Sequence, residues 1–191
     1  MTLNLGHGRG RALSHSWVTH AQIKRNLDRV ARVIADLQPD VVALQEVDAP
    51  SSWSGQFNHV DYLSEQTSLP HWFLGVQAHY SRLGLSYGTA LLSRHPLTRQ
   101  LNKPYRAKRW DAKGCVAATV SVGSAELTCI SSHLDAHSSR VRQRQLRALT
   151  QVVLAARKQG PVILGGDFNT SRRWARSPLH AFIDTLALQT E

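Results

Sequence analysis

Four polar clusters, each in or just after an apolar run, have the residue types for metal-assisted phosphate chemistry. They are Asn4, Glu46, His133 and the pair Asp167 and Asn169. A buried strand that ends in a polar residue places it at the rim of a sheet, so groups far apart in sequence can converge on one pocket. Carboxylates and amides suit a hard divalent cation beside a phosphate, and an imidazole can hold or transfer a proton. These residues therefore suit a site that holds a divalent cation beside a phosphate group.

The spacing of each cluster suggests what it does. Asp167 and Asn169 share one face of an extended segment, because alternate side chains point the same way. Glu46 follows a run rich in Val, Ala and Leu, where a carboxylate is costly to bury unless it is paired or binds a metal. His133 can polarise a phosphate oxygen, because an imidazole with a pKa of about 6.5 can be charged or neutral.

Structural alternatives remain open for these residues. Asn4 and Asp167 also suit turns, Glu46 could pair with an arginine at a strand end, and His133 could be a hydrogen-bonded structural histidine. His133, Asp135 and His137 would lie on one side of a continuing strand, which allows a zinc site. No second His/Cys cluster accompanies them, so zinc is the weaker interpretation.

Apolar periodicity and turn residues predict the elements that position these groups. Thr19 and Gln22 form a capping-box pattern ahead of a helix that Pro39 ends. Gly123-Ser124 indicates a hairpin between two strands, and Ser138 or Ser139 precedes a long helix that Gly160-Pro161 closes. The other expected elements are strands at 2–6, 41–47, 72–76, 89–92 and 162–165, short helices at 60–69 and 179–188, and a basic loop at 99–113.

Five stretches in a fixed order carry a family resemblance. The chain resembles the endonuclease/exonuclease/phosphatase superfamily, which includes deoxyribonuclease I-like phosphoesterases. No single stretch is decisive, but the ordered set is specific. The stretches are Thr2-Leu3-Asn4, Leu44-Gln45-Glu46, Tyr87–Pro96, Ser132-His133-Leu134 and Gly166-Asp167-Phe168-Asn169.

The resemblance implies both a fold and a set of roles. The fold would be α/β (α+β), a four-layer α-β-β-α sandwich of two mixed sheets with the site at the top. Glu46 and Asn4 would hold Mg²⁺ or Mn²⁺, Asp167 would position the attacking water, and Asn169 and His133 would contact the phosphate. Tyr87 corresponds to a tyrosine that such proteins use near the substrate.

The chain departs from this family pattern at its end. Such proteins normally finish with a Ser-Asp-His cluster, whereas the last histidine here, His180, has no neighbouring aspartate. We therefore expect one domain, 1–191, that is incomplete at its C-terminus. Weak activity is expected, because loss of one member of a catalytic set costs orders of magnitude in rate.

The charge of the chain indicates polyanionic partners. The formal net charge is +10 and the isoelectric point is about 10.4. Arginine outnumbers lysine and can bind phosphate with two donors, although a genomic bias toward arginine codons would give the same composition. Arginine and tryptophan occur together in two loops, which predicts contacts with a nucleic-acid backbone and its bases, or else solvated basic loops. The candidate residues there are Arg109, Arg172, Arg173 and Trp174.

These observations leave more than one function open. Hydrolysis of a nucleic-acid phosphodiester is the leading interpretation. The alternatives are a phosphoesterase acting on lipid or inositol phosphates, and a non-catalytic anion-binding remnant of the family. No apolar run is long enough for a membrane span. Cys115 and Cys129 suit small core residues in a reducing cytoplasm, with an upstream signal peptide left open.

Overall fold

Two four-stranded mixed sheets form the centre of the molecule. The computed structural model describes residues 1–12, 18–106, 112–170 and 178–189. Within them the first sheet has the order β1-β2-β4-β3 and the second the order β5-β6-β7-β8. The strands of the first sheet are β1 (Thr2–Asn4), β2 (Val41–Asp48), β3 (His71–Tyr80) and β4 (Leu85–Ser93). Those of the second are β5 (Leu97–Pro104), β6 (Gly114–Val122), β7 (Ala125–His133) and β8 (Val162–Asp167).

Each sheet has one parallel pair at one end of its strand order. β1 pairs with β2, and β7 pairs with β8, in parallel, whereas the remaining neighbours are antiparallel. The two parallel pairs also face each other, because β1 contacts β8 and β2 contacts β7 across the sandwich. The carboxyl ends of these four strands therefore meet at one rim of the molecule.

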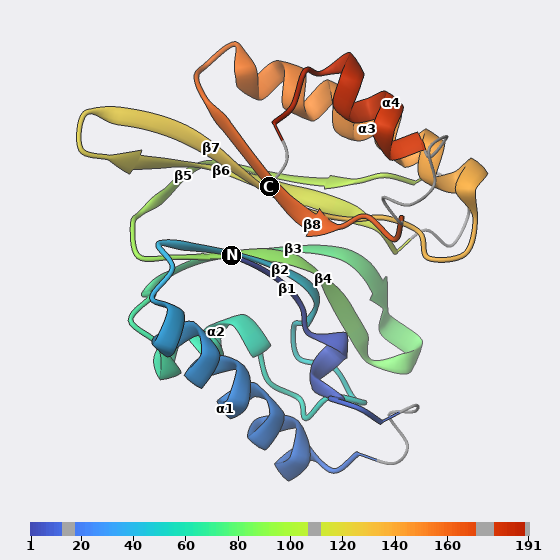
Figure 1. Cartoon of the computed structure of the whole chain (residues 1–191). Helices are drawn as coiled ribbons and strands as arrows, with labels where there is room; N and C mark the ends of the chain where they lie inside the picture. The colour runs from blue at the N-terminus through green and yellow to red at the C-terminus, as the bar shows by residue number, and fades with distance from the viewer. Residues whose placement is uncertain (13–17, 107–111, 171–177, 190–191) are drawn as a thin grey trace.

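The helices cover the outer face of each sheet. Figure 1 shows α1 (His20–Leu37) and α2 (His59–Gln66) outside the first sheet, and α3 (Ser139–Arg157) and α4 (Pro178–Thr185) outside the second. Short 3₁₀ turns lie at Gly6–Gly8 (η1) and Ser81–Leu83 (η3). The predicted four-layer sandwich of two mixed sheets is confirmed. Among the described residues, no helix is both long and apolar enough to cross a membrane.

α1 illustrates how local sequence produces these elements. Thr19 and Gln22 form the expected capping box, in which each side chain bonds the backbone of the other residue. Ile23 and Leu27 begin a buried stripe at helical spacing that faces the first sheet. The helix ends where Gln38 adopts a left-handed conformation, with φ of 47°, just before Pro39.

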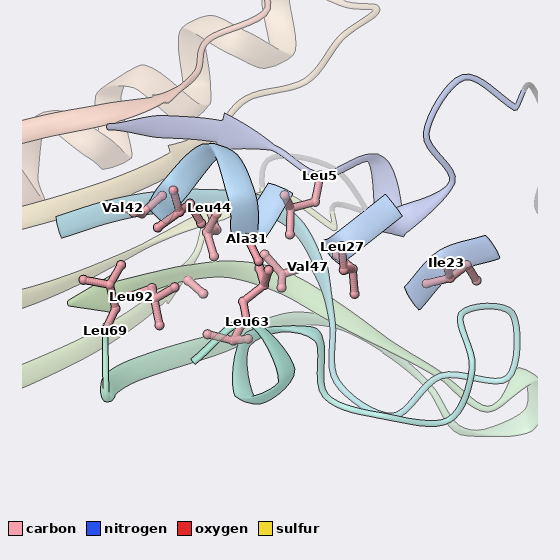
Figure 2. Packing of buried hydrophobic residues seen from close by; sticks show 13 residues of the cluster. Leu5, Ile23, Leu27, Ala31, Val42, Leu44, Val47, Leu63, Leu69 and Leu92 are labelled. Carbon is pink, nitrogen blue, oxygen red and sulfur yellow. The ribbon is translucent and has the colours of Figure 1, made fainter. Parts of the chain in front are cut away.

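Three apolar clusters hold the four layers together. Figure 2 shows the first, in which Leu27 and Ala31 of α1 and Leu63 of α2 meet Leu44 and Leu92 of the first sheet. A second cluster joins the other sheet to α3 and α4, through residues such as Ile130, Leu149 and Phe182. The third lies between the sheets and consists largely of small and β-branched residues: Ala43, Leu91, Val116, Ala118, Val120 and Cys129. Small residues there allow the sheets to approach closely.

Two expectations for local structure were wrong. Residues 97–104 form the strand β5 instead of the start of a basic loop. β5 is an edge strand with polar side chains and a bulge near Arg99, whose φ is 47°, so it lacks the alternation that identifies a strand. The first strand ends at Asn4 instead of residue 6, because the chain turns into η1 at Gly6.

Candidate active site

The polar residues predicted from sequence gather where the two parallel strand pairs end. Asn4 of β1 donates from Nδ2 to Oδ2 of Asp167 in β8 at 2.8 Å, across 163 positions of sequence. Gly165 permits this approach of the sheets, since a Cβ there would lie only 3.2 Å from the Cβ of Ala43. Gln45 also links the sheets, because its Nε2 donates to Oγ of Ser131 at 3.0 Å.

A β-bulge turns Glu46 toward this junction. The register between β2 and β4 shifts between Gln45 and Val47, and Glu46 has a φ of 50°. Bulges re-aim a side chain in this way, often beside functional sites. The Glu46 side chain is 20% exposed, with Oε1 3.5 Å from Nζ of Lys113 and 3.8 Å from Nε2 of His133. Glu46 is therefore a partly buried carboxylate at the centre of the cluster.

A turn after β8, and not an extended strand, brings Asp167 and Asn169 together. Asn169 has a φ of 48°, and its backbone N donates to Oδ1 of Asp167 at 3.0 Å. Its Nδ2 donates to the carbonyl oxygen of Leu134 at 2.9 Å and lies 3.3 Å from Nε2 of His133. The predicted shared face was thus wrong in its geometry, because an Asx turn replaces the strand alternation. The two side chains nevertheless reach the same site.

His133 is buried beside a lysine that the sequence did not indicate. Nζ of Lys113 lies 2.9 Å from Nε2 of His133. Burial and the Lys113 charge lower the pKa of His133 well below its ordinary value, against the opposing effect of Glu46 and Asp167. Burial likewise lowers the pKa of Lys113, which Glu46 partly offsets. His133 is therefore neutral at neutral pH, and its Nδ1 also lies 3.1 Å from Nζ of Lys113.

A buried pair, His7 and Asp48, lies beside Glu46. Nδ1 of His7 lies 2.6 Å from Oδ1 of Asp48, and Nε2 of His7 lies 3.6 Å from Oε2 of Glu46. The indole of Trp53 donates to Oδ2 of Asp48 at 2.6 Å. Burial raises the pKa of Asp48, but the hydrogen bond and charge of His7 outweigh it and lower that pKa overall. The signals available in sequence were the Gly-His-Gly turn and the position of Asp48 two residues after Glu46.

Tyr87 packs against His7 and Trp53. Its ring stacks on Trp53, with centroids 5.5 Å apart, and meets the edge of His7 at 4.8 Å. Burial raises the pKa of its hydroxyl. Tyr87 does not line the pocket described below, although it was predicted to contact substrate. In this structure it supports His7 by ring packing.

A pocket of about 630 Å³ opens in front of the cluster. One part of its lining consists of the predicted residues Asn4, Glu46, His133, Asp167 and Asn169. Another part comes from the loop after β1 and from α1, and includes Arg9, Arg11, Asn26 and Arg29, which sequence reasoning missed. The predicted residues Arg109, Arg172, Arg173 and Trp174 lie outside the described residues.

The side chains in the pocket offer oxygen ligands to a cation. Among the described residues, no three His, Cys, Asp or Glu side chains form a preassembled metal cluster. Glu46, Asp167 and Asn4 nevertheless present carboxylate and amide oxygens, which match the preference of hard divalent ions. Asp135 accepts from the backbone N of His137 and of Ser138 in the turn before α3, so it is not arranged for the zinc site considered from sequence.

Solved structures share this architecture at low sequence identity. An endonuclease/exonuclease/phosphatase from Beutenbergia cavernae matches with a TM-score of 0.66 and 23% identity, over 84% of this chain and 47% of that one. Sphingomyelinase C from Streptomyces griseocarneus matches with a TM-score of 0.65 and 18% identity, over 87% of this chain and 64% of that one. D. rerio TDP2 in complex with a single-strand DNA product matches with a TM-score of 0.63 and 19% identity, over 97% of this chain and 63% of that one. The chain thus spans about half to two thirds of the length of these structures.

A family sequence pattern matches nearly the whole chain. No curated protein matches the chain at a significant level. The sequence pattern of the Endonuclease/Exonuclease/phosphatase family covers residues 1–187, which include the strand ends that form the pocket. The resemblance predicted from five short stretches is thereby confirmed, and the chain belongs to the endonuclease/exonuclease/phosphatase family.

Proposed function

We propose that the chain hydrolyses phosphodiesters with the help of Mg²⁺ or Mn²⁺, and that a nucleic-acid strand is its substrate. The observation that carries this proposal is the convergence of Asn4, Glu46, His133, Asp167 and Asn169 on one pocket. Strand ends of both sheets contribute to it, so the arrangement is a property of the whole fold. The family includes nucleases and phosphatases by name, which agrees with this chemistry.

In the proposed reaction Glu46 and Asn4 hold the cation. When bound, the cation supplies charge that stabilises the phosphate oxygens during attack. The Glu46 carboxylate is held close to His7 and Lys113, so its orientation is set before any ligand arrives. Asn4 is oriented by accepting from the backbone N of Gly6 at 2.9 Å and donating to Asp167.

The remaining residues act on the phosphate and on water. Asp167 retains a 30% exposed side chain, so its carboxylate can hydrogen-bond a water molecule and align it for attack. Neutral His133 can donate from a ring nitrogen to a non-bridging oxygen, and the Nδ2 of Asn169 lies beside it. The ammonium group of Lys113 adds positive charge at the same place.

Two observations favour nucleic acid over the alternative, a lipid head group. The net charge of +10 favours a polyanion, and a structure with the same fold is TDP2 from D. rerio, solved with a single-strand DNA product. The lipid alternative is supported by the likeness to sphingomyelinase C from Streptomyces griseocarneus. Both alternatives use the same phosphate chemistry at the same residues.

The first test is hydrolysis of bis-p-nitrophenyl phosphate by the purified chain with Mg²⁺ or Mn²⁺. Asp167→Asn should lower kcat by about three orders of magnitude, because a member of a catalytic set is lost. Asp36→Asn, at an exposed position of α1, is the matched control and should leave kcat unchanged. Equal kcat for the wild type and Asp167→Asn, or activity that survives a chelator, would contradict the mechanism. Folded, metal-binding protein without activity would indicate a binding module instead.

A further inference from the structure

The loop after β1 is held tightly against α1. Gly8 and Gly10 have φ of 73° and 62°, conformations that favour glycine. A Cβ on Gly8 would lie 2.7 Å from Cγ2 of Ile23, and one on Gly10 would lie 2.8 Å from Nδ2 of Asn26. Nδ2 of Asn26 also donates to the carbonyl oxygen of Gly8 at 2.9 Å. The loop and the helix therefore form one continuous wall of the pocket.

Three arginines project from this wall. Nε of Arg9 donates to the carbonyl oxygen of Gly6 at 3.2 Å, and Arg9, Arg11 and Arg29 all line the pocket. Among the described residues, no carboxylate is paired with Arg11 or Arg29. Asp28, the acidic neighbour of Arg29 on α1, instead accepts from the hydroxyl of Tyr62 at 2.5 Å. We call Arg9, Arg11 and Arg29 the arginine wall.

The charged residues of the pocket come from different elements. The carboxylates of Glu46 and Asp167 lie in the part formed by the strand ends, and the arginine wall lies in the part formed by the loop and α1. A cation would concentrate at the carboxylates and an anion at the arginines. A guanidinium group binds phosphate with two parallel hydrogen bonds, which adds orientation to attraction.

We propose that the arginine wall binds a second phosphate of the substrate, adjacent to the ester that is cleaved. The proposal rests on the proposed function and narrows its substrate to a molecule with successive phosphates, such as a nucleic-acid strand. A head group that combines one phosphate with a cationic amine would place its positive charge against arginines, and like charges in contact are unfavourable.

The test compares two dinucleotides that differ only in flanking phosphates. Thymidylyl-thymidine has one internal phosphodiester, and its derivative phosphorylated at both ends has a phosphate on either side of that ester. The quantity measured is the ratio of kcat/KM for cleavage of the internal ester in the two substrates. The double variant Arg9→Gln/Arg29→Gln is compared with Arg25→Gln/Arg32→Gln, which removes the same charge from exposed positions of α1 outside the pocket.

The wild type should prefer the phosphorylated dinucleotide, and the wall variant should lose about tenfold of that preference. The control variant should retain it. Equal ratios in both double variants, or no preference in the wild type, would overturn the proposal. A proportional loss on both substrates in the wall variant would also overturn it, because that result reflects damage to the catalytic centre.

A binding measurement separates this proposal from the proposed function. Fluorescent oligothymidylate is titrated in the presence of a chelator, so that binding is read without turnover. The wall variant should bind about tenfold more weakly and with a shallower dependence of affinity on salt than the control variant. If neither dinucleotide is cleaved but this difference appears, the anion site stands and the proposed hydrolysis fails. Loss of binding to phosphatidylserine vesicles, with oligothymidylate binding unaffected, would assign the wall to a lipid surface and overturn the nucleic-acid proposal.

Discussion

Polar residues of both sheets lie at the rim where the parallel strand pairs end, but the contacts that hold Glu46 and Asp167 there differ. The first sheet supports Glu46 with a cluster of buried Asp48 and His7 and half-buried Trp53 and Tyr87. We call these four residues the support cluster. Asp48 is fully buried, with both carboxylate oxygens hydrogen-bonded. The position of Glu46 is therefore tied to the packing of the first sheet.

The second sheet places Asp167 at the surface of the pocket, where hydrogen bonds hold it. Asp167 accepts from Asn4 and from the backbone of Asn169, and its side chain remains 30% exposed. No ring packing supports it among the described residues that contact it. Both carboxylates line the pocket, but Glu46 has buried neighbours behind it in the first sheet, whereas Asp167 is held by hydrogen bonds to exposed and half-buried groups. Substitutions in the two regions should accordingly differ in their effects on stability and on activity.

The largest effect on stability is expected from Asp48→Ala. Removing this buried carboxylate takes away its hydrogen bonds to His7 and to the indole N–H of Trp53, which costs about 3–5 kcal/mol of unfolding free energy. The measurement is a urea titration followed by far-UV circular dichroism. Asp36→Ala on the exposed face of α1 is the control, and a comparable loss in both variants would refute the anchoring role of Asp48.

A smaller loss is expected from Trp53→Phe. This change removes the indole N–H that bonds Asp48 but retains a ring that can stack on Tyr87, so about 1–2 kcal/mol should be lost. Trp72→Phe is the matched control, because no hydrogen bond of its indole is present among the described residues. If both variants lose equal stability in the same urea titration, ring volume and not the hydrogen bond determines the effect.

Asp167→Asn should change stability by less than about 1 kcal/mol. Its site is open to solvent, and the amide oxygen of Asn can still accept one of the two hydrogen bonds. Combined with the large loss of activity predicted above, this result would separate the two sheets by function. A loss of stability as large as that of Asp48→Ala would show that Asp167 stabilises the fold as much as Asp48 does.

The smallest expected effect is on how stability depends on pH, through His59, which lies near Asp48 of the support cluster. Burial lowers the pKa of His59 below 6.5, against the opposing charge of Asp48. Below about pH 6.5 the unfolded chain binds a proton that the folded chain does not, so stability is lost as the pH falls. The urea midpoint should therefore fall between about pH 7.5 and about pH 5, and less steeply in His59→Leu.

Two other buried groups, His133 and Asp48, also affect how stability depends on pH. His133 has a lowered pKa of the same sign, so His59→Leu should reduce the dependence without abolishing it. The pKa of Asp48 is lowered from 3.8, so its own contribution is lost only at more acidic pH. An unchanged slope in His59→Leu would show that His59 is not responsible for the acid sensitivity.

Much of the fold could be predicted from local patterns. The capping box at Thr19, the Gly123-Ser124 hairpin and the buried run of β2 each follow from nearby residues, and the structure contains all three. β5 was missed because a bulged edge strand with charged side chains has no clear alternation. The long helix α3 begins after Ser138, as its capping pattern indicated.

The candidate site was predicted in part. Asn4, Glu46, His133, Asp167 and Asn169 were identified because carboxylates, amides and an imidazole after apolar runs are unusual. Three further residues were not identified from sequence, because their importance comes from neighbours distant in sequence: Lys113, Asp48 and His7. The arginine wall was missed for the same reason, as Arg29 is an ordinary surface residue until the loop after β1 packs beside it.

The sequence by itself determined most of the elements, the family and the kinds of chemical group available for reaction. These depend on periodicity, capping and residue type, which act over a few positions. Only the tertiary structure decided how those groups are oriented. The bulge at Glu46 depends on the pairing of β2 with β4, and the contact between Asn4 and Asp167 joins the two sheets. Such geometry depends on packing between segments remote in sequence, which local propensities do not encode.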